Sequence, residues 1–190
     1  MDAGLAAVLG ALAGAVATTG AAFATGWSAR EQAKIAARGE HRRQRRDARH
    51  TVYEEFIATV GEQMAHAAPL FEEDPPEDGD ELGRHFQSSG VRDTTSLLGD
   101  CYRLHNNVMK TLTKVQLAGP KDVTTTARRV CNHSFALATS LASIVGTPYR
   151  VDFLRTAFQH ANDRLQKLDM AVDAFIEAAQ TALDDDGTMS

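Results

Sequence analysis

The sequence contains only two cysteines, Cys101 and Cys131, and neither belongs to a Cys-x-x-Cys pair. Two cysteines are too few for a disulfide-stapled scaffold, and the pattern fits a reducing compartment. The chain also lacks a GxxxxGK phosphate loop, a GxGxxG turn, and the HExxH and GxSxG motifs of metal and serine hydrolases. Because no residue cluster requires a chemistry, we predict that the protein is not an enzyme and uses no cofactor.

A metal site also has little support in the sequence. Cys101 and His105 share one face of a predicted helix, and His133 would lie level with His105 in an antiparallel helix pair. These residue types can ligate a soft metal, but His133 lies off the apolar stripe of its helix. We therefore interpret Cys101 as a core residue, His105 as a boundary residue and His133 as a surface residue, and predict no bound metal.

Charged residues are absent from positions 3–27. A helix over this segment, at about 1.5 Å per residue, would cross the bilayer core of about 30 Å with margin. We therefore predict a transmembrane anchor over residues 1–27. Two alternatives remain open. One is a signal peptide cleaved at Ala22-Phe23-Ala24, although no positive charge precedes the apolar run. The other is a buried helix of a soluble domain.

Positive charge is concentrated directly after the anchor. Residues 28–50 carry eight Lys/Arg against three Asp/Glu, a balance of +5, whereas residues 51–190 carry a balance of −9. Lysine and arginine beside a transmembrane helix stay on the cytoplasmic side. The asymmetry therefore predicts a single-pass protein of the cell membrane, with its N-terminus outside and its C-terminal domain in the cytoplasm.

Within this basic juxtamembrane helix, Arg30, Lys34, Arg38, Arg42 and Arg46 recur every four residues and would form one positive stripe. The simplest role of the stripe is to hold the orientation of the anchor. A second role is contact with anionic lipid, which we assign to Arg30, Lys34 and Arg38 because salt screens the attraction within about 8–10 Å. Binding to nucleic acid is disfavoured, because no aromatic residues are interleaved and the following domain is acidic.

Small residues recur every four positions along the predicted anchor. Gly10, Gly14 and Thr18 belong to a row that runs from Ala6 to Gly26. In lipid, such a row lets two helices approach closely, so we predict that the anchor associates through these residues and forms a homo-oligomer. The alternative is that the row only reflects a segment rich in Ala, Gly and Thr.

The remainder of the chain shows the apolar periodicity of helices. We predict four of them, over about 51–69, 92–118, 120–146 and 151–184, with Gly119-Pro120 as the sharpest turn. The second helix could also begin earlier, near Leu82. The last has a heptad seam over four repeats, formed by Val151, Leu154, Phe158, Ala161, Leu165, Leu168, Val172, Phe175 and Ala179. Short connections make successive helices antiparallel. The predicted fold is therefore all-α, with a transmembrane helix that continues into an antiparallel four-helix bundle.

The sequence predicts two segments without regular secondary structure, one within the bundle domain of residues 51–184 and one after it. The acidic stretch 72–81 contains Pro and Gly and almost no apolar residues, which predicts a solvated loop over about 70–90. The Asp-rich C-terminus predicts a disordered tail over 185–190.

Two stretches, 41–48 followed by Tyr53 and then 115–123, resemble signatures of small uncharacterised helical proteins from high-GC actinobacteria. In that group an apolar N-terminal helix, a basic Arg-Arg-Asp-Ala-Tyr-like stretch and a Leu-x-Gly-Pro-x-x-Val turn occur in the same order. Here four residues separate Ala48 from Tyr53, so the aromatic residue is displaced. The resemblance implies a membrane-anchored helical protein and carries no activity.

These patterns favour one function and leave one alternative. The favoured function is a membrane-tethered interaction module, a scaffold or sensor that binds an unknown protein partner. The alternative is an oligomerising membrane effector or pore component, for which Thr18, Thr19 and Thr25 are the only polar candidates to line a channel.

Overall fold

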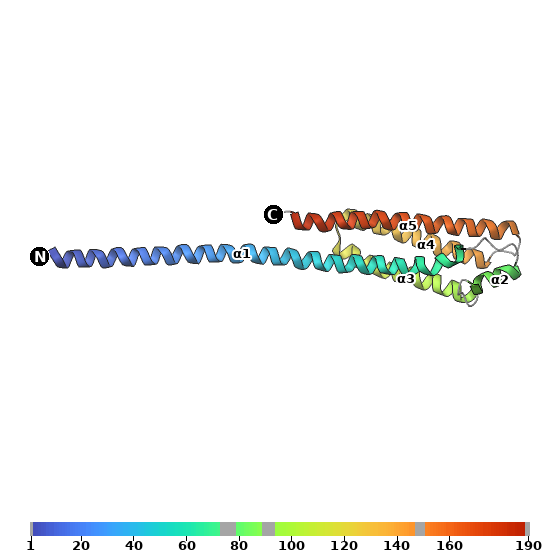
Figure 1. The fold of residues 1–190 in the computed structure, drawn as a ribbon, viewed down its shortest axis with the longest axis horizontal. Coiled ribbons are helices and arrows are strands. Elements are labelled where there is room, and N and C mark those ends of the chain that lie inside the picture. Colours follow the sequence, from blue (N-terminus) through green and yellow to red (C-terminus); the bar gives the residue numbers. More distant parts are fainter. Residues whose placement is uncertain (1, 73–78, 89–93, 147–150, 189–190) are drawn as a thin grey trace. The chain divides into compact units, whose positions relative to one another are not determined.

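The structure is a computed structural model that describes the backbone of residues 2–72, 79–88, 94–146 and 151–188. Within these ranges it describes side chains from residue 30 to residue 185, apart from 79–80, 82–83, 87, 94–95, 146 and 151–152. The described backbone forms five α-helices and one 3-10 turn (Figure 1): α1 (Asp2–Ala67), η1 (Ala68–Phe71), α2 (Gly79–Ser88), α3 (Thr94–Ala118), α4 (Lys121–Gly146) and α5 (Val151–Thr188). This part of the chain contains no strand, so the all-α prediction is confirmed.

The chain divides into two units, Met1–Arg45 and Arg46–Ser190. In the first unit α1 carries exposed side chains at every described position, 30–45. Among the residues that the structure describes, no helix is both long and apolar enough to cross a membrane. The side chains of the predicted anchor, residues 3–27, lie outside the described ones, so the anchor stays a prediction from the sequence.

The second unit is a helical bundle built from α3, α4, α5 and the C-terminal part of α1. Arg49 of α1 bonds Ala118 of α3, and Glu55 bonds Lys114, so the two helices run antiparallel. Helix α4 packs against both α3 and α5. These contacts confirm the predicted bundle, in which successive long helices alternate in direction (Figure 1).

Aromatic residues join α1 to α5 in the core. The Phe175 ring lies edge-on to Tyr53 and Phe56, with centroid distances of 5.9 and 4.9 Å. At the opposite end of the bundle, Phe71 of η1 lies 6.2 Å from Phe158. Tyr53 and Phe56 meet the later part of α5, whereas Phe71, further along the chain, meets its earlier part, so α1 and α5 also run antiparallel.

The predicted heptad seam is the face that α5 buries. Its buried members are Leu154, Phe158, Ala161, Leu168, Phe175 and Ala179, whereas Leu165 and Val172 are partly buried against the same core. The side chain of Val151 lies outside the described ones. Burial of this face removes large aliphatic and aromatic groups from water, which is the main favourable contribution to folding.

The turn between α3 and α4 lies where the sequence predicts it. Gly119 donates a backbone hydrogen bond of 2.8 Å to Val115, and α4 begins directly after Pro120. A Cβ atom at Gly119 would lie 3.0 Å from both the Tyr53 hydroxyl oxygen and the Val115 carbonyl oxygen, so a larger residue would have to displace these neighbours. The Arg49 Nε donates a 2.8 Å hydrogen bond to the last carbonyl of α3, at Ala118, which satisfies an acceptor that the helix end leaves open.

Two predictions about irregular segments are wrong in part. Helix α2 occupies residues 79–88 of the predicted acidic loop, because His85 and Phe86 are buried and fix this segment on the bundle. His85 Nε2 lies 2.8 Å from the Leu70 carbonyl oxygen, and its ring lies edge-on to Phe158. Residues 73–78 of that loop lie outside the described ones.

The C-terminal tail is the second correction. Helix α5 continues to Thr188 instead of ending near residue 184. Ala182 and Leu183 are partly buried against the core, so the helix still has a packed face where the aspartates follow. That packing outweighs the weak helix propensity of aspartate.

Candidate functional site

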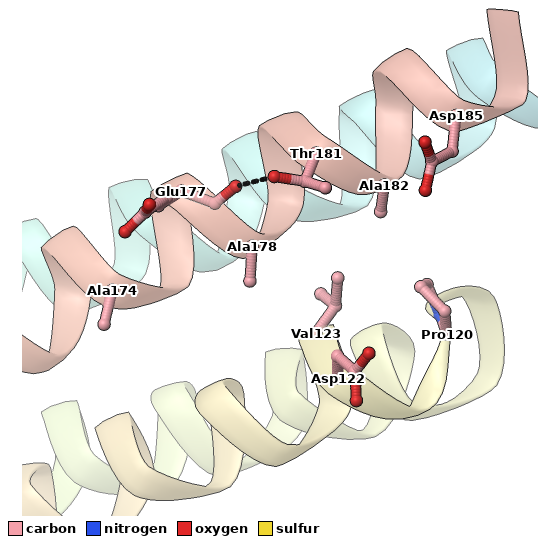
Figure 2. A pocket seen from close by; sticks show the side chains of 9 residues that line it. All are labelled: Pro120, Asp122, Val123, Ala174, Glu177, Ala178, Thr181, Ala182 and Asp185. Atoms are coloured by element: carbon pink, nitrogen blue, oxygen red, sulfur yellow. Dashed lines mark hydrogen bonds between the residues drawn. The ribbon is translucent and has the colours of Figure 1, made fainter. Parts of the chain in front are cut away.

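A groove of about 350 Å³ opens between the first turn of α4 and the C-terminal half of α5. Figure 2 shows the side chains that line it. The residues on the α4 side are Pro120, Asp122 and Val123, and those on α5 are Ala174, Glu177, Ala178, Thr181, Ala182 and Asp185. The groove therefore lies at the end of the bundle at which Arg49 of α1 bonds the Ala118 carbonyl oxygen.

Three alanines at helical spacing create the space. Ala174, Ala178 and Ala182 follow one another every four residues and point toward α4 in Figure 2. Ala178 and Ala182 are partly buried and pack beside the core, but their methyl groups do not fill the distance to Val123. Larger residues at these positions would fill the groove against α4.

Carboxylates surround this apolar floor. Asp122, Glu177 and Asp185 line the groove, and none of the lining residues is a lysine or arginine. Within the described part of the chain, Asp122 and Glu177 form no ion pair. Thr181 adds a hydroxyl group whose hydrogen bond goes to the carbonyl oxygen of Glu177, at 2.9 Å (Figure 2). An apolar floor with an acidic rim suits a ligand that carries positive charge on an apolar stem.

A second polar feature lies inside the bundle. Ser134 of α4 is fully buried, and its Oγ donates a 2.6 Å hydrogen bond to Oε1 of the buried Gln63 of α1. The Gln63 Nε2 donates to the Ser134 carbonyl oxygen at 3.1 Å. His105 Nδ1 lies 2.9 Å from the same Ser134 Oγ. Because the Ser134 proton is used by Gln63, His105 must donate, which places a proton on Nδ1.

The buried polar cluster of Gln63, His105 and Ser134 has a structural role. The Ser134 hydroxyl group joins α1, α3 and α4, because it bonds both Gln63 and His105. Each of these hydrogen bonds pairs a donor with an acceptor. Burial lowers the pKa of His105, so the ring favours its neutral form. The ring also packs against Phe135 at a centroid distance of 5.3 Å.

Neither cysteine has the environment of a nucleophile. Burial, assisted by the nearby Asp100 carboxylate, raises the pKa of Cys101 to about 11. Burial raises the pKa of Cys131 to about 12. Both thiols therefore stay protonated near neutral pH, and only the thiolate is reactive.

The three residues that the sequence analysis considered as metal ligands are not gathered into a site. Cys101 is buried, His105 is bonded to Ser134, and His133 is only partly buried. No group of three or more His, Cys, Asp or Glu residues in the described regions is arranged to hold a metal ion.

The other predicted site residues lie on α1. Arg30, Lys34 and Arg38 are exposed, and Lys34 forms only a solvent-exposed pair with Glu31 at 3.7 Å. Gly10, Gly14 and Thr18 lie on the helical backbone of α1, but their side chains lie outside the described ones.

Comparison with known proteins gives no matching family, no similar curated protein and no similar solved structure. The candidate site therefore rests on the geometry of this chain. The sequence analysis missed both the groove and the buried polar cluster. The alanine row of α5 is visible in the sequence, and Gln63 interrupts the apolar stripe of α1 between Val60 and Ala67, which is the signal of a buried polar residue.

Proposed function

We propose that the protein is a membrane-tethered helical interaction module that acts by binding a partner and not by catalysis. Residues 3–27 cross the cell membrane with the N-terminus outside, and the bundle lies on the cytoplasmic side. The observation that carries the proposal is the acidic, alanine-floored groove at the end of the bundle where Arg49 bonds Ala118. An acidic surface of this kind is complementary to a partner of opposite charge, and such complementarity favours specific association.

The environments of the two cysteines and of the His105–Ser134 pair favour a binding protein over an enzyme. The two thiols are held protonated by burial, and the buried polar cluster uses its histidine to satisfy a serine that already donates elsewhere. A nucleophilic serine would instead give its proton to the histidine.

The exposed basic residues of α1 support contact with the membrane surface. Arg30, Lys34 and Arg38 follow the anchor within about three turns and are open to solvent. Each can gain about 1 kcal/mol from anionic headgroups, and salt weakens that gain. These residues therefore add to the anchor and do not replace it.

Membrane fractionation tests the tether directly. The full chain should remain in membranes washed with alkaline carbonate, whereas a chain that begins at Ser28 should be released by high salt. Release of the full chain by carbonate would contradict the proposal, because a spanning helix resists that treatment.

Self-association of the anchor is the second part of the proposal. Replacing Gly10 and Gly14 together with Ile should block close helix approach and lower dimerisation in a membrane two-hybrid assay, while insertion is kept or improved. Leu9→Ile, one position off the ridge, is the matched control and should change little. Equal dimerisation of the wild type and the double variant would assign the small residues to composition alone.

A further inference from the structure

The outer surface of α3 and α4 carries a group of exposed apolar side chains. Tyr102 and Met109 of α3 are 43% and 44% exposed, and Phe135 of α4 is 51% exposed. His105 joins them, because it lies one helical turn from both α3 residues and its ring contacts Phe135. We call Tyr102, Met109 and Phe135 the α3–α4 patch. Large apolar side chains that gather on an exposed surface mark a site of interaction.

The charge of the bundle indicates which partner fits the patch. Residues 94–146, which contain α3 and α4, carry six Lys/Arg against two Asp/Glu, a balance of +4, whereas α5 carries three against eight, a balance of −5. Arg128 is exposed and lies seven residues before Phe135, so it borders the patch on the same side of α4. A complementary partner therefore carries acidic residues beside an exposed apolar side chain.

Helix α5 of the same protein presents such a surface. Met170 is 72% exposed, and it lies two residues after the buried Leu168, which places it on the outward face of the helix. Asp163 and Asp173 are exposed, and they lie on the same face, seven residues before Met170 and three residues after it. We call Asp163, Met170 and Asp173 the α5 ridge. The ridge has an apolar centre and acidic ends, which matches an apolar patch with a basic border.

Contacts inside the bundle set the heights of the two surfaces along it. Tyr53 of α1 packs on Phe175 of α5, and these helices are antiparallel. Gln63, ten residues after Tyr53, is therefore level with the position ten residues before Phe175. The Ser134 hydroxyl group bonds both Gln63 and His105. His105 of α3 is consequently level with position 165 of α5.

The two exposed methionines lie at one height. Helices α3 and α5 both run antiparallel to α1, so they run in the same direction. Met109 lies four residues after His105, which makes it level with position 169 of α5, directly beside Met170. A second copy that is shifted sideways, without a change of height, can therefore place its Met170 on Met109 of the first.

The charged residues match in the same arrangement. The Cys131 thiol of α4 lies 3.9 Å from the Val108 carbonyl oxygen of α3. Arg128, three residues before Cys131 in the antiparallel α4, is therefore level with position 111 of α3, two residues past the methionine of the patch. Asp173 lies three residues past the methionine of the ridge. The sideways shift that joins the two methionines thus also brings Arg128 to the height of Asp173.

We propose that the α5 ridge of one copy packs on the α3–α4 patch of a second copy. Met170 contacts Met109 and Phe135, because a thioether packs well on aromatic and aliphatic groups, and Asp173 pairs with Arg128. Helix α4 lies between α3 and α5, and the ridge projects away from the core, so the ridge and the patch lie on different sides of the bundle. The contact is therefore heterologous, and it repeats into a row of copies. The proposal rests on the proposed membrane tether, which keeps the copies parallel and at one height.

Crosslinking between two differently tagged full-length copies in membranes tests the contact. One copy carries Met170→Cys and the other carries Met109→Cys, and a short bis-maleimide reagent should link the two tags. Wild-type chains should give no product, because both native thiols are buried. Ala58→Cys replaces Met109→Cys in the matched control. Ala58 is exposed and lies five residues after Tyr53, so it is level with Met170 but belongs to α1.

The yield of the Met170–Met109 pair should exceed that of the Met170–Ala58 pair by about fivefold or more. Two copies that both carry Met170→Cys should give little product, because a row does not bring two ridges together. Asp173→Arg in the first copy should remove most of the Met170–Met109 product, and Arg128→Asp in the second copy should restore it.

Three results would overturn the proposal: equal yields with Met109 and Ala58, a dominant Met170–Met170 product, or a yield that charge reversal leaves unchanged. The membranes are washed with alkaline carbonate after crosslinking. A failed tether is therefore seen separately, as chain lost from the pellet.

Discussion

Ser134 offers the sharpest test of the interior of the bundle, because one hydroxyl group serves three helices. Ser134→Ala removes the donor to Gln63 Oε1 and the acceptor of His105 Nδ1. His105 is partly exposed, so water can replace its lost partner. Gln63 is only 2% exposed, so its Oε1 stays buried without a donor. A buried polar group left unsatisfied costs about 1–3 kcal/mol, and we expect the free energy of unfolding to fall by that amount.

Urea unfolding of the full chain in mild detergent, followed by circular dichroism, measures this loss. With a slope of about 1–3 kcal/mol per molar urea, the midpoint should move by roughly 1 M. Ser143→Ala is the control on the same helix. It removes an exposed hydroxyl group and should change stability by less than about 0.5 kcal/mol.

A double variant separates the polar cluster from simple packing. Gln63→Leu combined with Ser134→Ala replaces both partners with apolar groups, so the pair should be less destabilised than Ser134→Ala alone. A cost for Ser134→Ala no larger than that of Ser143→Ala would refute the reasoning. So would a double variant that loses the sum of the two single effects.

Three further predictions concern the core and the titratable groups. Leu168→Ala should cost about 2–5 kcal/mol of unfolding free energy in the same assay, and Leu165→Ala clearly less, because only Leu168 is fully buried. Burial lowers the pKa of His105, so the folded state binds its proton less readily than the unfolded chain. Stability should therefore decrease as the pH falls through about 6.5, and His105→Gln should flatten that part of a urea titration between pH 8 and pH 5. Burial raises the pKa of Cys101 to about 11 and that of Cys131 to about 12, so a thiol reagent at pH 8 should label neither until urea is added.

The long helices were predictable because the apolar periodicity and the turn residues that define each one lie within its own stretch of sequence. The heptad seam of α5 and the Gly119-Pro120 turn are local patterns, and the structure places both where the sequence does. Helix α2 was not predicted as a separate helix, because the acidic residues and prolines before it give this part of the chain the composition of a loop. The sequence offered only an earlier start of the next helix, near Leu82. The stability of α2 comes from the burial of His85 and Phe86, and His85 contacts η1 and α5. Nothing in the sequence of residues 79–88 indicates these partners.

The candidate sites depend on distances that the sequence does not contain. The buried polar cluster joins residues that are 71 and 29 positions apart, and only the packing of three helices brings them together. The groove follows from the gap between the alanines of α5 and Val123 of α4, so the row of alanines alone could not reveal it. In contrast, the anchor and its orientation stay predictions, which depend only on the local charge and hydropathy of the sequence.

Orientation in the membrane is the most direct test of the account as a whole. Two reporters at the C-terminus give opposite signals: an alkaline phosphatase is active only outside the cytoplasm, and a fluorescent protein matures only inside it. The Lys/Arg excess after residue 27 predicts a silent phosphatase and a fluorescent fusion in the membrane fraction. An active phosphatase with no fluorescence would contradict the account. It would indicate export after cleavage near Ala22-Phe23-Ala24 and place the bundle outside the cell.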